Sequence, residues 1–446
     1  MHEDDKNTCI QGGFYMRWVV LGFLFLLSVL NYTDKSVLGL AAEPIMSELN
    51  LTYDQFGLVG SSFFAAYAIG SIVLGTLTYR FNSKYLLMMI ATGWTLSLAS
   101  AYFVETLTHL ILLRIVLGFF EGSTLSMCLV HLARWFTSSQ RGTATAIMTS
   151  GTTVGTYLAA PLLVMGITNF GWQHTFALLG VASLVWAIFF FFMRDEPKQP
   201  LVEDVKSLAS NKEVPFKHIL KVFINPYVLS ILVVGFVSMW ITTWVLTWAP
   251  TYLTQIVGLE PQNMSLIFAA MGITGTVFAI CVGKFTDFLF KKNKSLIKSY
   301  DRVLVTVLFV GATSYAMTTV ISSPVLACIF LGIGLILNTS LLPLNAAIKT
   351  LIIPKNLVGS ITGISLSISS MAGVIGPWIT GYLITLAGDD IRAGFNAGVI
   401  VIVCLYVVTA IVLLATRKLK ITATEKDDAS RAAEEEELKL DVAVEQ

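Results

Sequence analysis

The chain has 446 residues, of which 55% are hydrophobic and only 13% are charged. Soluble proteins carry about 25% charged residues, so this composition and a mean hydropathy of +0.75 indicate a polytopic membrane protein. A net charge of +1 excludes the basic surface of a nucleic-acid-binding protein. The five scattered cysteines give no zinc-type spacing and no disulfide framework, and no cofactor is expected.

Apolar stretches long enough to cross a bilayer as helices, which takes about 20 residues, recur along the chain. The polar segment 1–16 before the first stretch lacks the basic start of a signal peptide, so that stretch is expected to remain as an anchor. The twelve expected spans are 17–39, 55–79, 85–104, 107–131, 143–167, 172–193, 226–252, 264–289, 301–320, 324–348, 358–387 and 392–416.

Basic residues concentrate in every second loop. Arg80 and Lys84 lie between spans 2 and 3, and Lys349 and Lys355 lie between spans 10 and 11. The alternate loops carry mainly acidic residues, such as Glu43. Because basic loops stay in the cytoplasm, both termini are predicted to be cytoplasmic.

The expected fold is an all-α membrane protein of two six-helix halves, 17–193 and 226–416. The linker 194–225 begins R-D-E-P-K-Q-P and ends in apolar residues at helical spacing, which favours a helix on the inner membrane surface or a plain solvated helix. A weak repeat between 75–84 and 283–292 supports the halving. The acidic tail 417–446 is expected to be disordered or a frayed helix.

Two charged residues interrupt span 4. Arg114 and Glu121 are seven residues apart, which is almost two helical turns, so both point to one side, ~10 Å apart along the axis. A charge at the centre of a membrane helix costs ~2.5–3.5 kcal/mol on insertion scales, and such residues commonly mark ion or substrate pathways. The alternative is a structural ion pair between helices.

Span 1 carries Asp34 and Lys35 at a depth of ~25 Å from Arg17. Span 4 runs in the opposite direction, so Asp34, Lys35 and Arg114 are expected at one level, with Glu121 deeper. Burial disfavours a charged carboxylate and a nearby Arg or Lys favours it, so Asp34 and Glu121 are predicted to be proton sites. The cations suit an anionic substrate. A lock between Asp34 and Lys35 or Arg114 is the alternative.

Neutral residues in other spans complete the candidate site. They are Tyr67, Thr152, Trp244 and Ser367. The alternatives are an interfacial or packed side chain at Tyr67 and a hydroxyl bonded to its own helix backbone at Thr152. Trp240, Trp244 and Trp248 form one stripe, which is expected either to line a cavity or to pack against lipid. The second half has no charge in the middle of a predicted span, so charge coupling is expected in the first half and neutral hydrogen bonding in the second.

Taken in order, several motifs resemble the major facilitator superfamily, and within it the anion:cation symporters: sialin, vesicular glutamate transporters, and bacterial galactonate and hexuronate transporters. The resemblance runs from about Arg17 to Ala415. The motifs are N-Y-T-D-K-S from Asn31, R-I-V-L-G-F-F-E-G from Arg114, R-W-F-T-S-S-Q-R from Arg134, T-W-A-P-T-Y-L from Thr247 and G-V-I-G-P-W-I-T-G-Y-L from Gly373.

The resemblance implies that Asp34 and Glu121 are proton-linked carboxylates. It implies that Lys35, Tyr67 and Arg114 contact or gate the substrate. By the same resemblance the gating residues are Arg80, Asp287 and Arg141. The chain departs from the pattern at Lys35, where relatives carry Arg, and at Tyr79, where the superfamily turn carries Asp.

The predicted function is proton-coupled symport of a small organic anion by alternating access. The expected partners are that anion, protons and the lipid bilayer, and the protein is expected to be a monomer in a bacterial inner membrane. A proton-driven exporter of drugs or metabolites, a uniporter or exchanger of a neutral or zwitterionic solute, and a non-transporting sensor are the alternatives. An enzyme is not expected, because no nucleophile with a base and no nucleotide loop appears.

Overall fold

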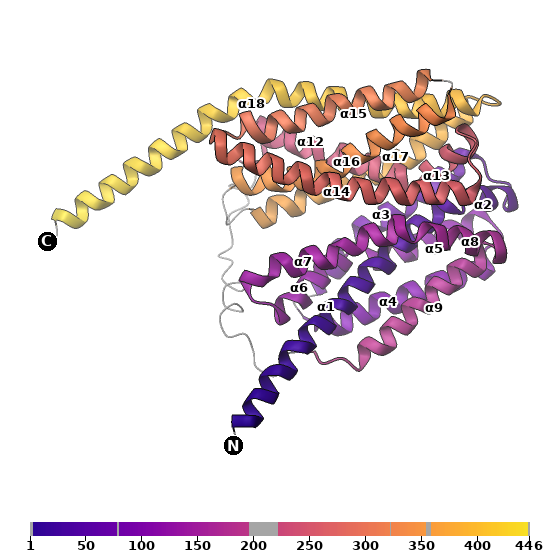
Figure 1. Ribbon diagram of the computed structural model, residues 1–446, viewed down its shortest axis with the longest axis horizontal. Coiled ribbons are helices and arrows are strands. Elements are labelled where there is room, and N and C mark those ends of the chain that lie inside the picture. Colours follow the sequence, from indigo (N-terminus) through magenta and orange to yellow (C-terminus); the bar gives the residue numbers. More distant parts are fainter. Residues whose placement is uncertain (1–2, 78–79, 196–221, 322, 354–357, 445–446) are drawn as a thin grey trace.

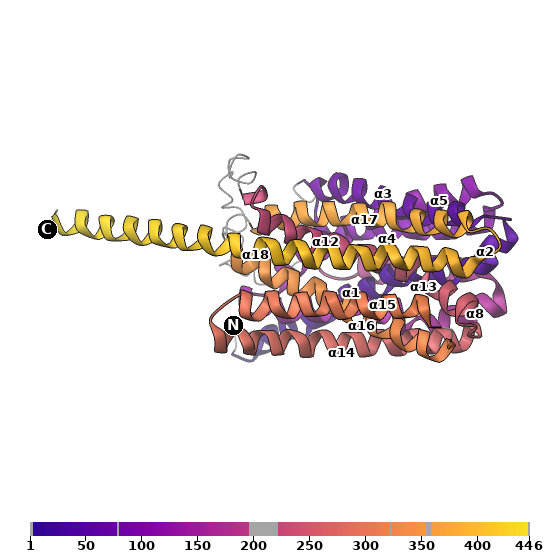
Figure 2. The same cartoon turned by 90° about the horizontal axis from the view of Figure 1, so that it is seen from above.

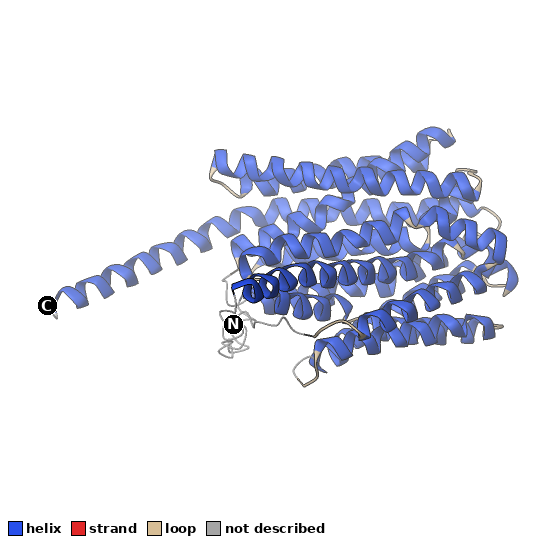
Figure 3. Cartoon of the chain, turned by 60° about the horizontal axis from the view of Figure 1, so that its bottom comes forward, coloured by secondary structure: helices blue, strands red, loops and turns tan. Residues whose placement is uncertain are grey.

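The computed structural model describes residues 3–77, 80–195, 222–321, 323–353 and 358–444. Across these residues the chain is helical, without strands, as Figure 3 shows. The helical elements of the first half are α1 (Glu3–Leu40), α2 (Ala42–Glu48), α3 (Tyr53–Leu77), α4 (Ser83–Ala99), η1 (Ser100–Phe103), α5 (Leu107–Glu121), α6 (Thr124–Trp135), α7 (Ser138–Thr153), η2 (Val154–Leu158), α8 (Ala160–Phe170) and α9 (Trp172–Phe191).

The second half repeats this helical plan. Its elements are α12 (Pro226–Thr247), α13 (Ala249–Thr251), η3 (Tyr252–Ile256), α14 (Pro261–Asn293), η4 (Ile297–Asp301), α15 (Arg302–Val320), α16 (Pro324–Ile352), α17 (Val358–Leu386) and α18 (Ile391–Val444). Figure 1 shows the two halves as two groups of helices, with α1 to α9 in one and α12 to α18 in the other.

Eleven of the described helices are long and apolar enough to cross a membrane. A pair of helices joined at a bend gives a twelfth span if the pair is counted as a single span. This confirms the predicted twelve spans. The bent pair, Ser139–Leu158 and Ala160–Phe170, turns by 43°. Pro161 supplies the reason, because proline has no N–H for the helical hydrogen bond and its ring clashes with the carbonyl four residues earlier.

Both chain ends lie at the same end of the bundle, where Figure 1 marks N and C. We call this the terminal end, and we call the opposite end, where α2 and α13 lie, the closed end. The long apolar helices run between these two ends. Because the number of spans is even, the first and last spans meet the membrane on the same side.

The tail after span 12 is helical in the structure. The helix α18 continues from the membrane span to Val444, and Figures 1 and 2 show it projecting away from the bundle. Residues 417–444 contain no Gly or Pro and are rich in Ala, Glu, Lys and Leu, which are strong helix formers. The predicted surface helix in the linker falls mostly on 196–221, outside the described residues.

Candidate functional site

Four charged side chains gather inside the first half. Asp34 and Glu121 are 0% exposed, Arg114 is 2% exposed and Lys35 is 6% exposed. They project from α1 and α5 into the protein and away from lipid, as the spacing of Arg114 and Glu121 predicts. Buried charges of this kind are costly unless they are paired.

A close approach of two helices brings aromatic side chains to these charges. A Cβ atom added at Gly118 on α5 would lie 2.3 Å from the backbone oxygen of Phe63 on α3. Only glycine allows the two backbones to come this near. The contact holds Phe63 and Tyr67 of α3 beside the charged residues of α1 and α5.

Lys35 forms an ion pair with Glu121. Its Nζ lies 2.6 Å from Oε2 of Glu121 and donates to Oδ1 of Asn31 at 2.5 Å. The Nδ2 of Asn31 donates to the same Oε2 at 2.8 Å, so the three side chains form a closed triad. The Lys35 Nζ also lies 5.4 Å from the ring centroid of Tyr67, which places Tyr67 at the site.

The guanidinium of Arg114 lies over an aromatic ring and leaves one donor, its Nε–H, without a described acceptor. Its guanidinium carbon lies 4.3 Å from the ring centroid of Phe63, a cation–π contact. One terminal nitrogen donates to the backbone oxygen of Asp34 at 3.5 Å. The Nε–H is buried and has no acceptor among the described residues. One edge of the guanidinium is therefore available to a ligand.

Asp34 forms no ion pair with any residue that the structure describes. Both of its carboxyl oxygens are buried, and neither accepts a hydrogen bond from the part of the chain that the structure describes. The alternative of a lock to Lys35 or Arg114 is therefore wrong for this conformation. The reason is direction: successive helical residues point ~100° apart, and Lys35 points to Glu121.

The remaining predicted substrate-binding residue of the first half is Thr152, on α7 (Ser138–Thr153). Thr152 is half-buried on α7. Its neighbour Gly151 packs against the backbone of α1, where an added Cβ would lie 2.7 Å from the oxygen of Phe25. Thr152 therefore lies on a helix that contacts α1, and the described contacts do not join it to the charged residues.

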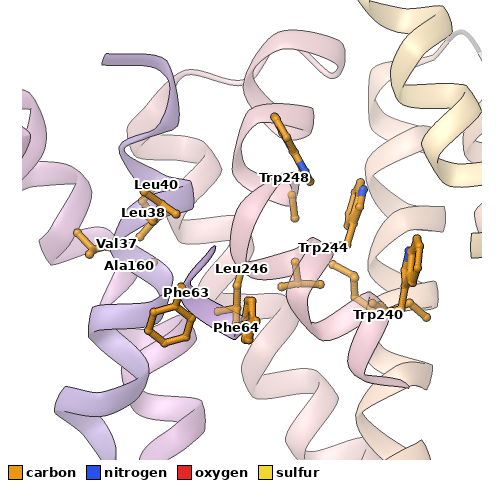
Figure 4. Close-up of a cluster of buried hydrophobic side chains, with 14 of the residues drawn as sticks. Val37, Leu38, Leu40, Phe63, Phe64, Ala160, Trp240, Trp244, Leu246 and Trp248 are labelled. Atoms are coloured by element: carbon orange, nitrogen blue, oxygen red, sulfur yellow. The ribbon is translucent and has the colours of Figure 1, made fainter. Parts of the chain in front are cut away.

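Trp244 lies in the core of the second half. It is 0% exposed, its ring centroid lies 6.1 Å from that of Tyr252, and its indole N–H has no acceptor among the described residues. Figure 4 shows Trp240 and Trp244 on α12 and Trp248 just after its end, among buried apolar side chains. The expected alternative of packing against lipid is wrong, because all three rings are buried.

The serines of α17 divide between two faces. Ser367 is exposed, whereas Ser365 and Ser369 are buried. Residues two apart on a helix point ~200° apart, so Ser367 faces away from the other two. The structure thus brings Ser365 and Ser369, rather than Ser367, into the interior of the second half.

The second half also buries two charged side chains near the terminal end. Asp301 is 0% exposed and accepts a hydrogen bond from the hydroxyl of Tyr227. Lys349 is 8% exposed and lies inside α16, not in the loop where the sequence analysis placed it. Span 10 runs to Ile352 because its sequence, N-A-A-I-K-T-L-I, keeps apolar residues at helical spacing past the lysine.

The three predicted gating residues lie at the terminal end, and the side chains of Asp287 and Arg141 contact their own half. Arg80 is exposed in the turn before α4. Asp287 accepts a hydrogen bond from the Tyr300 hydroxyl at 2.5 Å. Arg141 donates to the backbone oxygens of Ala133 and Phe136, both at 3.0 Å. Tyr79, the departure from the superfamily turn, is outside the described residues.

Side-chain hydrogen bonds join the two halves at the closed end. Tyr53 donates to Gln255 at 2.7 Å, Thr385 to Asp54 at 2.9 Å and Thr254 to Glu43 at 2.5 Å. The backbones also touch, since a Cβ added at Gly57 would lie 2.5 Å from the oxygen of Pro377. A cavity of about 220 Å³ remains between the halves here, lined by Glu43, Thr168, Pro250, Thr251 and Met264 among others.

The site therefore combines two buried cations, two buried carboxyls and an unused guanidinium edge within a helical membrane bundle. Among the described residues, no group of three or more His, Cys, Asp or Glu is placed to hold a metal ion. Fold and site together define a polytopic transporter built from two six-helix halves.

Comparison with known proteins places the chain in a family. The model of the Major Facilitator Superfamily matches residues 24–342, and the chain belongs to this superfamily. A hexuronate transporter of Bacillus subtilis is 28% identical over 85% of this chain and 90% of its own length. A probable galactarate/D-glucarate transporter of Escherichia coli is 25% identical over 88% and 92%. These relatives confirm the predicted resemblance to the anion:cation symporters.

Solved structures confirm the fold. A bacterial homologue of the human lysosomal transporter Spinster superposes with a TM-score of 0.76 at 16% identity, covering 90% of this chain and 97% of that one. The protein is thus a multi-pass membrane transporter, and the predicted fold of twelve helices in two halves is confirmed.

Proposed function

We propose that the protein is a proton-coupled symporter that takes up a small organic anion by alternating access. The observation that carries this proposal is the Lys35–Glu121 ion pair beside an Arg114 whose Nε–H has no acceptor among the described residues. The site is complete within one chain, so a monomer is sufficient. We expect the protein in a bacterial inner membrane, with the terminal end in the cytoplasm.

Arg114 and Lys35 are the proposed anion-binding residues. The Nε edge of a guanidinium matches the two oxygens of a carboxylate, whereas a lysine acts as a point charge. Relatives named as transporters of hexuronate and of galactarate or D-glucarate support a carboxylate cargo. Tyr67 lies beside Lys35 and is a candidate to contact the body of the cargo.

Coupling follows from competition for Lys35. When a cargo carboxylate binds Lys35, Glu121 loses its counter-charge in a buried position, which is unfavourable until a proton neutralises it. When the cargo leaves, Glu121 pairs with Lys35 again and releases the proton. Asp34 is the second proposed proton site, because a buried carboxyl without hydrogen-bond donors is less costly when it carries a proton.

The closed end supports an assignment of the conformation. Three side-chain hydrogen bonds and the Gly57–Pro377 contact join the halves there. We assign this structure to the inward-facing state after cargo release, in which Lys35 and Glu121 have paired again. Arg80, Asp287 and Arg141 at the terminal end are the proposed gating residues for the opposite state. Thr152, Trp244 and Ser367 are further proposed contacts of the cargo.

Proteoliposome transport tests the proposal. An inward proton gradient is expected to drive accumulation of D-glucuronate or D-glucarate by the wild type. Glu121→Gln is expected to abolish the stimulation by the gradient while it retains exchange of labelled for unlabelled anion, because Lys35 still binds the cargo. Glu260→Gln, at an exposed site, is the matched control. Gradient-driven uptake that survives in Glu121→Gln, or is missing for both acids in the wild type, contradicts the proposal.

A further inference from the structure

Three lysines are buried in the described part of the protein, and two of them have strong partners. Lys35 pairs with the Glu121 carboxylate at 2.6 Å. Lys84 donates to two backbone oxygens, those of Phe191 at 2.7 Å and Met193 at 2.6 Å, at the end of α9. Both arrangements offset the cost of removing an ammonium group from water.

The third, Lys349 on α16, lacks such compensation. Its Nζ donates to the hydroxyl of Ser365 on α17 at 2.5 Å, and its side chain is 8% exposed. Among the ion pairs of the described residues, all with N–O distances up to 4.0 Å, none involves Lys349. A neutral hydroxyl offsets little of the cost of burying a full charge. A buried ammonium group in a membrane span is therefore expected to bind an anion, which would offset the cost of its burial.

Unused polar groups surround this lysine. Asn345 lies one turn earlier on the same face of α16 and is 1% exposed. Its Nδ2 donates to the backbone oxygen of Ile231 at 2.7 Å, but its Oδ1 accepts no hydrogen bond from the described residues. A Cβ added at Gly235 on α12 would lie 2.8 Å from Ser369 Oγ and 3.5 Å from Asn345 Nδ2. Side chains of α16 and α17 thus meet against the backbone of α12.

The cluster lies between the proposed anion site and the terminal end. Gly373 on α17 packs against Phe64, the neighbour of the ring that holds Arg114. Ser365 is eight residues before Gly373, or ~12 Å nearer the terminal end along α17. One turn further, Ile353 and Ile361 are buried in an apolar cluster with Val222, Phe223 and Ile352. Apolar side chains at the end of α16 and the start of α17 thus follow the polar cluster toward the terminal end.

We propose that Lys349 and Asn345 form a second binding station for the transported anion, which the cargo occupies on its way from Arg114 and Lys35 to the terminal end. The cargo carboxylate replaces the Ser365 hydroxyl on Lys349, and a cargo hydroxyl donates to the Oδ1 of Asn345. The station therefore selects a hydroxylated carboxylate, such as a sugar acid. This inference rests on the proposed organic-anion transport.

The test measures D-glucuronate uptake by proteoliposomes that contain the full chain. Lys349→Gln is expected to lower the maximal rate about 10-fold or more, with little change in the half-saturating concentration, because the central site is intact. Lys349→Arg restores most of the rate, because it keeps the charge. Lys292→Gln, at an exposed terminal-end lysine, is the matched control.

Ser365→Ala separates this role from a structural tie between α16 and α17. It removes the same hydrogen bond and leaves the Lys349 charge buried without its described partner, so it is expected to lower the melting temperature at least as much as Lys349→Gln but to lower uptake at most twofold. Equal losses of uptake in the two variants, wild-type rates in Lys349→Gln, or no rescue by Lys349→Arg overturn the station while wild-type transport stands. Absence of carboxylate uptake by the wild type overturns the proposed function and the station together.

Discussion

Replacing Lys35 by Gln is expected to destabilise the protein more than any other single change at the site. Glu121 would then be buried with Asn31 as its only remaining described partner. Removing one member of a buried ion pair costs about 3–5 kcal/mol, because the other charge remains unpaired. The measurement is the thermal unfolding of the purified protein in detergent, in which Lys35→Gln melts well below the wild type.

The double variant Lys35→Gln with Glu121→Gln supplies the control. It replaces the ion pair by two neutral amides, so its melting temperature is expected to recover most of the loss. Lys291→Gln, at an exposed lysine, is expected to leave the melting temperature unchanged. If the double variant is as unstable as the sum of the two single variants, Lys35 and Glu121 do not stabilise each other in the folded protein.

Replacing Arg114 by Lys is expected to have the largest effect on cargo affinity. Lysine keeps the positive charge but loses the flat guanidinium that lies on Phe63 and the Nε edge that matches a carboxylate. Losing one charge-assisted hydrogen bond costs about 1.5–3 kcal/mol, which corresponds to roughly 10-fold or more in affinity. The half-saturating concentration of D-glucuronate should therefore rise by about that factor.

Arg302→Lys, at an exposed arginine of α15, is the matched control for this change. It should leave the half-saturating concentration unchanged. Thermal unfolding of Arg114→Lys should stay close to that of the wild type, because the buried charge is retained. An Arg114→Lys variant with wild-type affinity contradicts a direct contact between the guanidinium and the cargo.

Hydropathy and helical periodicity predict the fold and the main charges well. The twelve spans follow from apolar length, and Arg114 and Glu121 face inward because residues seven apart share one side of a helix. The bend at span 5 is also encoded locally, by Pro161. These features are determined by residues that lie close together along the chain, so they can be predicted from the sequence alone.

Pairings between helices depend on side-chain direction, which spacing along one helix does not give. The depth estimate grouped Lys35 with Arg114, but the long lysine side chain reaches Glu121 instead. Asn31 was missed as the third member of the triad, although its position one turn before Lys35 was a usable signal. The same signal favours Ser365 and Ser369, four residues apart, over Ser367.

Lys349 was missed because a lysine near a predicted helix end normally counts as part of a basic loop. The structure extends span 10 past it and places Ser365 of the next span beside its Nζ. This contact joins residues sixteen positions apart on two different helices, so the periodicity within either helix does not predict it.

Proton uptake on cargo binding tests the central claim most directly, namely that cargo displaces Glu121 from Lys35 and that Glu121 then takes a proton. D-glucuronate is added to purified protein in weakly buffered solution near neutral pH, and a pH indicator records the change. Wild-type protein is expected to take up about one proton for each anion bound, and Glu121→Gln none. Anion binding to the wild type without proton uptake, or equal uptake by both proteins, would contradict the account.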